Sequence, residues 1–282
     1  MQLLTEFAQN DAWRHDPMPN RRWRGAVAAG IPRGMLSLLT VAIVAISVFF
    51  TATLSGIFGM AGGLVLLAVL LAMLPVATAI AVHGAIQIVA NGSRAWFSRA
   101  FIDWRILIHI CIGLLAAAAI LLLVRYSPDL ASVCIVIGLM PVLVWIPKDW
   151  LALDASKPLH AVLCGLLGGG LNLTVGVSGP TVDVFFIRTQ MDRRRIVATK
   201  AATQVVSHGA KVAFYGGLAS AMDGNDLLLV LIGAPFAIAG TNLGYRILQR
   251  LSDDGFRTWT RYVVTAIGIF YLWRGFSLLM GG

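Results

Sequence analysis

Charged side chains are scarce in this sequence. Asp, Glu, Lys and Arg together make up 12% of its 282 residues, whereas an ordinary soluble domain is roughly a quarter charged. So few charges cannot cover the surface of a water-soluble fold of this length. Apolar stretches of about 18 or more residues recur with hardly a charge inside them, which is the length that crosses a hydrocarbon core about 30 Å thick. The composition therefore predicts an all-α polytopic membrane protein.

Motifs for catalysis and for ATP use are absent as well. The three cysteines lie within apolar stretches without metal-ligand spacing, which favours a packing role over a disulfide framework. The histidines show no metal-ligand spacing with carboxylates, and the sequence has no nucleotide-binding P-loop. We therefore predict no catalytic residue, no metal and no cofactor, and we disfavour both an enzyme and an ATP-driven pump.

Lys and Arg nevertheless exceed Asp and Glu, which gives a net charge of +9. They lie mainly in the connections between apolar stretches and in the N-terminal segment, where lipid headgroups and topology explain them without nucleic acid. Residues 1–35 form a tail that we expect at the membrane surface. Arg21 and Arg22 resemble a twin-arginine signal, but the apolar run starts well beyond them without a cleavage site, which favours an uncleaved tail.

Apolar stretches long enough to span a bilayer occur at 36–58, 106–124, 131–147, 159–178, 227–248 and 259–279. Two further regions are interrupted. Pro75 divides 63–93, and the polar run 190–195 divides 180–219, so each is predicted to form a pair of shorter helices. Non-helical backbone at membrane depth is tolerated where protein or a water-filled cavity satisfies it, which favours the interior of a transporter for these breaks.

The chain also matches itself at an offset of 117 residues. Gly62 falls on Gly179 at this offset, and Gln87 falls on Gln204 within a window, 81–97, that holds six identities in 17 positions. Each half would contain three full spans and one broken or re-entrant pair, and hence an odd number of crossings. The halves are therefore predicted to be inverted repeats, with about eight to ten membrane helices in all. The two repeats are 36–147 and 158–279.

Basic residues of the short loops gather on one side of this predicted topology. By the positive-inside rule that side is cytoplasmic, although the arginines of the tail argue for the reverse. We favour the loop count and leave the side of the termini open. The residues on the basic side are Arg94, Arg99, Arg105, Lys148, Lys157, Arg246, Arg250 and Arg257.

A glycine-rich turn precedes the short helix of each half. Such a turn leaves backbone amides free at the positive end of a helix dipole, which makes an anion site without a buried cation. The alternative is close helix packing by small residues. The duplication of the pattern favours the site. Its residues are Gly59, Gly62 and Gly63 in the first half and Gly176, Ser178 and Gly179 in the second.

The helix after each break carries a polar stripe at spacings of four, four and three residues. The stripes are His83, Gln87, Asn91 and Arg94, and Lys200, Gln204, His208 and Lys211. Polar groups at membrane depth are costly unless they face a protein interior or a wet cavity, so the two stripes are predicted to line a pathway from opposite sides. As alternatives, Arg94 and Lys211 would snorkel to the headgroups, and His83 would be a packing histidine.

Asp183 is the acidic residue of an otherwise apolar short helix. It would carry a coupling proton, because desolvation favours the protonated carboxyl, or it would form a structural ion pair with Lys200 or Arg188. The residues leave these alternatives open. His83 is the second candidate for coupling.

Two motifs give the chain a resemblance to a known family. The run Ser-Gly-Ile-Phe-Gly-Met-Ala-Gly-Gly at 55–63, its counterpart Gly-Val-Ser-Gly-Pro at 176–180 and the paired helices resemble the sulfite exporter TauE/SafE family. The resemblance covers about 40–279. It implies a multi-pass protein, located in the inner membrane of a bacterium, that moves sulfite or a related organosulfur anion.

Together these features predict a secondary transporter, and more specifically an exporter of a small anion. The anion would bind between the two glycine-rich breaks near the midplane and be released by alternating access. The alternative is an anion channel or a membrane scaffold subunit without coupled transport. The expected partners are the small anion and the lipid bilayer, and the sequence leaves open whether the protein is a homo-oligomer.

Overall fold

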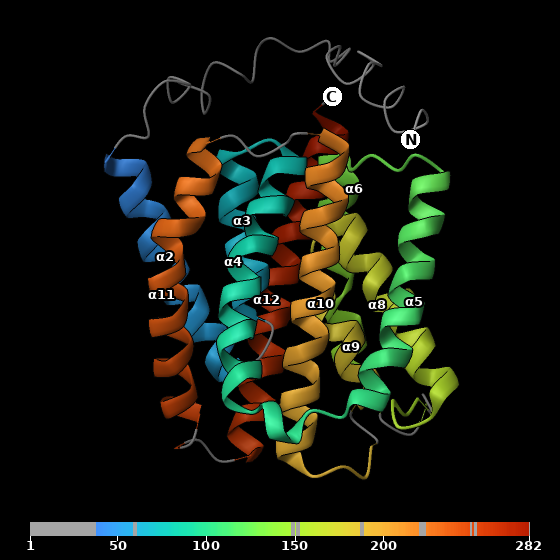
Figure 1. Ribbon diagram of the computed structural model, residues 1–282. Helices are drawn as coiled ribbons and strands as arrows, with labels where there is room; N and C mark the ends of the chain where they lie inside the picture. The colour runs from blue at the N-terminus through green and yellow to red at the C-terminus, as the bar shows by residue number, and fades with distance from the viewer. Residues whose placement is uncertain are drawn as a thin grey trace.

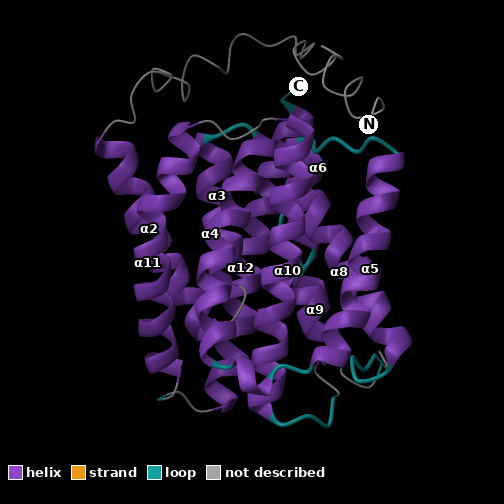
Figure 2. Cartoon of the chain, in the orientation of Figure 1, coloured by secondary structure: helices purple, strands orange, loops and turns teal. Residues whose placement is uncertain are grey.

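The computed structural model describes residues 38–58, 61–147, 150, 153–186, 189–219, 224–248, 250 and 253–281. Helices dominate this part of the chain, and no strand occurs in it (Figure 2). Six of the described helices are long and apolar enough to cross a membrane. The prediction of an all-α polytopic membrane protein is therefore confirmed, while the predicted tail, 1–35, lies outside the described residues.

The chain order runs through helices of very different lengths. It is α2 (Leu38–Phe58), α3 (Ala61–Met73), α4 (Val76–Phe97), the 3-10 helix η2 (Arg99–Phe101), α5 (Trp104–Leu123), α6 (Leu130–Leu139), α7 (Pro141–Trp145), α8 (Pro158–Val175), α9 (Gly179–Phe186), α10 (Arg193–Ala219), α11 (Gly224–Leu248) and α12 (Asp253–Met280). Five of the six predicted spans correspond to single long helices.

The remaining span, 131–147, is wrong as a single helix. It is divided into α6 and α7 because Pro141 has no backbone N–H to continue the ladder and its ring clashes with the preceding turn. The two interrupted regions also differ from expectation in one respect. Their first members, α3 and α9, are short, with 13 and 8 residues, but α4 and α10 are full-length helices of 22 and 27 residues.

Aspartates fix the starts of three helices. The carboxylate of Asp103 accepts the Ile106 N–H at the start of α5, that of Asp129 accepts the Ser132 N–H at α6, and that of Asp192 accepts the Arg194 N–H at α10. Each such cap stabilises its helix by about 1 kcal/mol. Asp129 lies in a loop outside the spanning helices, and the Ser132 hydrogen bonds hold the pKa of its carboxyl below the ordinary value.

The helices are arranged as two outer pairs around a central pair (Figure 1). α2 packs on α11 at one edge of the bundle, α5 packs on α8 at the opposite edge, and α4 packs on α10 between them. α6 packs on α12. The two short helices lie toward opposite ends of the bundle, with α3 near the end at which α12 finishes and α9 near the other. The main apolar core fills the space among α3, α4, α6, α8 and α12.

Small residues let the outer helices approach closely, as is common in membranes. A Cβ atom on Gly113 of α5 would come within 1.9 Å of the Val162 carbonyl oxygen of α8. A Cβ atom on Gly165 of α8 would come equally close to the Ile110 carbonyl oxygen of α5. Because these neighbours are backbone atoms, they can move only if the two helices separate.

Replacing Gly113 by Ala should therefore lower the thermal unfolding midpoint of the purified protein. Overpacking of this kind costs about 1–3 kcal/mol. The matched control is Gly209→Ala in α10, where an added Cβ would meet nothing within 4 Å. That change should leave the midpoint unchanged or raise it, since Ala is a better helix former than Gly. Equal midpoints for the two variants would contradict the close α5–α8 contact.

Candidate functional site

The second glycine turn connects α8 to α9. Gly176 ends α8 with φ of +85°, a left-handed conformation that favours glycine, and its N–H donates to the Asn172 carbonyl at 3.1 Å. Ser178 follows, and α9 begins at Gly179; both are buried. The first amides of α9 have no partner within the helix. The structure thus has a glycine turn at the start of a short helix, and a role of its amides in binding an anion stays a prediction.

The first glycine turn is described only in part, because Gly59 lies outside the described residues. Gly62 and Gly63 are buried at the start of α3. A Cβ atom on Gly62 would lie 1.7 Å from the Thr51 carbonyl oxygen of α2, so this glycine serves close packing. A Cβ atom on Gly63 would lie 2.7 Å from Nε2 of Gln87, so the amide of Gln87 fills the space beside this turn.

A polar bridge joins the two turns through α4 and α10. Nε2 of His83 lies 3.0 Å from the Gly63 carbonyl oxygen, and Nδ1 of His83 lies 2.9 Å from Nζ of Lys211. Lys211 also donates to the Gly176 carbonyl oxygen at 2.7 Å. Because a carbonyl only accepts, Nε2 of His83 carries the hydrogen and Nδ1 accepts from Lys211.

Lys211 is fully buried, which overturns the alternative that it snorkels to the headgroups. Lys211 lies two turns before the end of α10 at Ala219, the end that the sequence predicted for this region, and this position carries its side chain into the interior. Arg94, by contrast, does lie in the last turn of α4.

Side chains satisfy the carbonyls that the end of α8 leaves without helical partners. The Tyr215 hydroxyl donates to the Leu173 carbonyl at 2.6 Å, and the Tyr126 hydroxyl donates to the Thr174 carbonyl at 3.1 Å. Lys211 completes the set at Gly176. A helix end inside a hydrocarbon layer has no water to supply these bonds, so these three side chains make the break tolerable.

A small cavity lies beside the second turn, between α5, α8, the start of α9 and α10. Its apolar wall comes from α5 and α8, and its polar wall comes mainly from α10. Two buried polar atoms in that wall, Oγ1 of Thr203 and Nδ1 of His208, have no hydrogen-bond partner among the described residues. The polar lining residues are Ser178, Thr203, Gln204, Ser207 and His208.

The predicted site residues fall into two groups. Ser178, Gln204 and His208 are brought together at the cavity. On α4, Gln87 and Asn91 are buried but do not belong to the cavity lining. The Asn91 side-chain amide donates to the Gln87 backbone carbonyl at 3.0 Å. The ring of His83 packs edge-on against that of His208, with centroids 5.6 Å apart, so the two polar stripes do meet. Their role in binding an anion stays a prediction.

Two cavity residues, Thr203 and Ser207, were missed in the sequence. They lie directly before Gln204 and His208 on α10, but single Ser and Thr residues are common in membrane helices, where they bond to neighbouring helices. Asn172 of α8 donates to both the carbonyl and the hydroxyl oxygen of Ser207, at 2.9 and 2.8 Å. This bond across helices fixes the polar wall in place.

Asp183 and Lys200 form an ion pair. This is one of the two alternatives that the sequence left open, and it places Lys200 against Asp183 of α9 instead of in the cavity wall. Lys200 precedes Gln204 by one helical turn, and Asp183 follows the cavity residue Val182. The ion pair therefore lies next to the cavity, toward the end of the bundle at which α5 and α10 begin.

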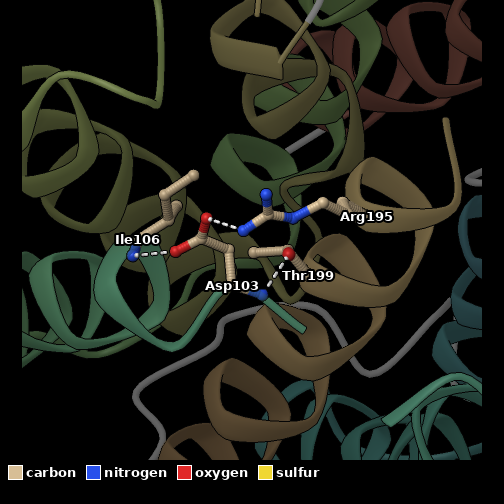
Figure 3. A network of polar contacts seen from close by, with 4 residues as sticks. All are labelled: Asp103, Ile106, Arg195 and Thr199. Carbon is tan, nitrogen blue, oxygen red and sulfur yellow. Dashed lines mark hydrogen bonds and ion pairs between the residues drawn. The ribbon is translucent and has the colours of Figure 1, made fainter. Parts of the chain in front are cut away.

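A polar network ties those two helix starts together (Figure 3). One carboxylate oxygen of Asp103 accepts the Ile106 N–H, and the other accepts the Arg195 guanidinium at 2.8 Å. The Asp103 N–H donates to the Thr199 hydroxyl at 2.9 Å. The network holds α10 against α5, the two helices between which the cavity opens.

Comparison with models of protein families gives a match. The model of the family described as "Sulfite exporter TauE/SafE" matches residues 43–271, which is most of the chain. Comparison with curated proteins and with solved structures gives no match. The matched range includes both glycine turns, both polar stripes and the cavity.

Replacing Tyr215 by Phe should destabilise the fold, because it leaves the buried Leu173 carbonyl without its hydroxyl donor. The expected loss is about 1–3 kcal/mol of unfolding free energy. Tyr262→Phe, at an exposed position of α12, removes the same atom and should change little. Thermal unfolding of both variants in detergent checks this, and an unchanged midpoint for Tyr215→Phe would show that the α8 end does not depend on its side-chain donors.

Proposed function

The chain belongs to the sulfite exporter TauE/SafE family, and we propose that it is a secondary transporter that exports a small oxyanion. Sulfite or an organosulfur anion is the proposed substrate, and the inner membrane of a bacterium is the proposed location. The observation that carries the proposal is the cavity beside the α8–α9 turn. Two residues that line it, Thr203 and His208, have buried polar atoms without partners among the described residues, inside a bundle of helices long enough to span a membrane.

The chemistry of the lining suits an oxyanion. Hydroxyl groups of Ser178, Thr203 and Ser207 and the amide of Gln204 donate hydrogen bonds without a fixed charge. The start of α9 adds free amides and the positive end of a helix dipole. No carboxylate lines the cavity within the described part of the chain. Neutral donors bind an anion without the strong attraction that would prevent its release.

Two lysines set the potential around this cavity. Lys211 lies one turn beyond His208 on α10 and has no ion-pair partner among the described residues, so its positive charge is uncompensated when it is protonated. Lys200 lies on the other side, where Asp183 neutralises it. The net effect is a positive potential directed toward the inner end of the cavity, which attracts an anion.

Alternating access is supported by the way in which the two halves, 36–147 and 158–279, pack. If α2 corresponds to α8 and α5 to α11, then the α2–α11 pair and the α5–α8 pair are the same contact made twice. The α4–α10 and α6–α12 pairs then join corresponding helices across the axis that relates the halves. α3 and α9 lie toward opposite ends of the bundle (Figure 1), as inverted repeats require.

The two turns differ in how they are filled. The second turn borders the cavity, whereas the space beside Gly63 in the first turn is occupied by the Gln87 amide. In the proposed cycle the halves exchange these roles, so that an anion gains access from one side at a time. The end of the bundle with Arg99, Arg105 and Arg195 is the proposed cytoplasmic side, where basic residues would collect anions before export.

Anion binding can be tested on the purified protein. A ligand that binds only the folded state raises the free energy of unfolding, by about 2.7 kcal/mol at a hundredfold excess over Kd, and so raises the unfolding midpoint. Sulfite, sulfoacetate and chloride are compared, and sulfite or sulfoacetate should stabilise the protein more than chloride does. Replacing Gln204 by Leu should weaken this stabilisation about tenfold in apparent Kd, because it removes the amide donor from the cavity wall.

The matched control is Gln190→Leu, since Gln190 is exposed in the connection between α9 and α10. It should bind the anions like the unsubstituted protein. If no oxyanion stabilises the protein, or if Gln204→Leu responds like Gln190→Leu, the cavity is not the binding site and the proposed function fails.

A further inference from the structure

Lys211 is a lysine with no exposed surface in the interior of a membrane bundle. It lies eight residues from the end of α10, and its contact His83 lies seven residues from the start of α4, so at a rise of about 1.5 Å per residue both are about 10 Å or more from the helix ends. No described carboxylate pairs with it. Ionisable groups in such places are costly, and they mark ion or proton pathways.

The hydrogen bonds of Lys211 are compatible with both of its protonation states. Its two acceptors are the Gly176 carbonyl and Nδ1 of His83, and the second ring nitrogen of His83 donates to the Gly63 carbonyl. A neutral amine has two N–H groups, which satisfy both acceptors. The proton that is lost is the third one of the ammonium group, which neither acceptor needs. Lys211 can therefore gain or lose a proton without breaking the bridge between the two turns.

We propose that Lys211, held by His83, is the proton-binding site that couples anion transport to proton movement. This inference rests on the proposed function and adds its coupling ion. Nζ of Lys211 is hydrogen-bonded to His83, whose ring contacts the ring of His208, and His208 lines the anion cavity. Only the His83 and His208 rings thus separate a proton on Lys211 from the proposed anion site.

Coupling follows from electrostatics in a medium of low dielectric. Protonated Lys211 strengthens the attraction of the cavity for an anion, and an anion in the cavity strengthens the hold of Lys211 on its proton. Linkage makes the two effects equal, and such couplings typically correspond to a 5–150-fold change in affinity. The anion and the proton are therefore bound and released together, and they cross the membrane in the same direction. Export then follows the outward concentration gradient of the anion and carries a proton out with it.

The other titratable groups around Lys211 have different partners. On α10, Tyr215 donates to the Leu173 carbonyl, and Lys200 is paired with Asp183. On α4, Arg94 lies in the last turn and donates to the Asn91 amide oxygen. α8 contributes only a backbone carbonyl to the bridge. His208 is the one nearby group with a buried nitrogen lacking a described partner, so the test must separate it from Lys211.

The experiment uses the full-length protein in lipid vesicles with the membrane potential clamped to zero. Two rates are measured with labelled sulfite: exchange between labelled and unlabelled sulfite at equal pH, and accumulation driven by a pH about one unit lower outside than inside. Exchange reports anion binding and access alone. One proton per anion supports an accumulation ratio of at most about tenfold for one pH unit.

The unsubstituted protein should both exchange and accumulate sulfite. Lys211→Arg, with a charge that cannot be removed, should exchange sulfite but should not raise the sulfite concentration inside the vesicles above that outside. Lys211→Met should bind sulfite about tenfold more weakly and should not accumulate it. The matched control is Lys157→Met, at an exposed lysine before α8, which should behave like the unsubstituted protein. Because sulfite itself takes up protons near neutral pH, the difference between the unsubstituted protein and Lys211→Arg is the readout.

A second measurement needs no Lys211 variant. The detergent-solubilised protein and the sulfite solution are first brought to the same pH in weak buffer. Mixing them should then cause proton uptake by the protein, which a pH-sensitive dye reports. His208→Gln should bind sulfite more weakly, because His208 lines the cavity, but at saturating sulfite it should take up as many protons as the unsubstituted protein, because Lys211 and His83 stay in place.

The outcomes separate the two proposals. Absence of sulfite exchange in the unsubstituted protein overturns the proposed function itself. Three outcomes overturn the assignment of the coupling proton to Lys211 and leave the anion cavity standing. They are exchange together with equal accumulation by Lys211→Arg, absence of proton uptake on sulfite binding to the unsubstituted protein, and loss of that uptake in His208→Gln at saturating sulfite.

Discussion

The fold depends on satisfying backbone groups where two helices break inside a hydrocarbon layer. Each glycine turn ends an apolar helix within the bundle, and a buried carbonyl without a donor there would cost several kcal/mol. Tyr215, Tyr126 and Lys211 donate to the carbonyls at the end of α8, and His83 donates to Gly63 at the start of α3. The same side chains thus stabilise the turns and place ionisable groups next to them.

The two halves solve this problem in different ways. At the second turn the break leaves a cavity with unpartnered polar atoms on Thr203 and His208. At the first turn the corresponding space is occupied by the Gln87 amide. The proposed alternating access would require the two turns to exchange these arrangements. The Lys211–His83 hydrogen bond crosses the contact between α4 and α10, which belong to different halves of the chain.

Much of the helical plan could be predicted from the sequence, because hydropathy and helix breakers act locally. The breaks at Pro75 and at the polar run before α10 appear where they were predicted. The failure at Pro141 has the same local cause, since an apolar stretch hides a proline that ends a helix. α4 and α10 were expected to be shorter helices, because Pro75 and the polar run 190–195 divide their regions, but both are full-length helices. They meet through the rings of His83 and His208.

The sequence by itself determined that this is a polytopic membrane protein of the TauE/SafE family with two glycine-rich helix breaks, because apolar length, glycine spacing and breakers are written along the chain. Only the tertiary structure decided which polar residues meet. The stripe spacing is the same on α4 and α10, yet Gln204 faces a cavity and Gln87 fills a turn, and Lys211 reaches a histidine 128 positions away. Periodicity fixes the face of a helix, but the rotation, depth and partner of that face follow from the packing of all the helices together.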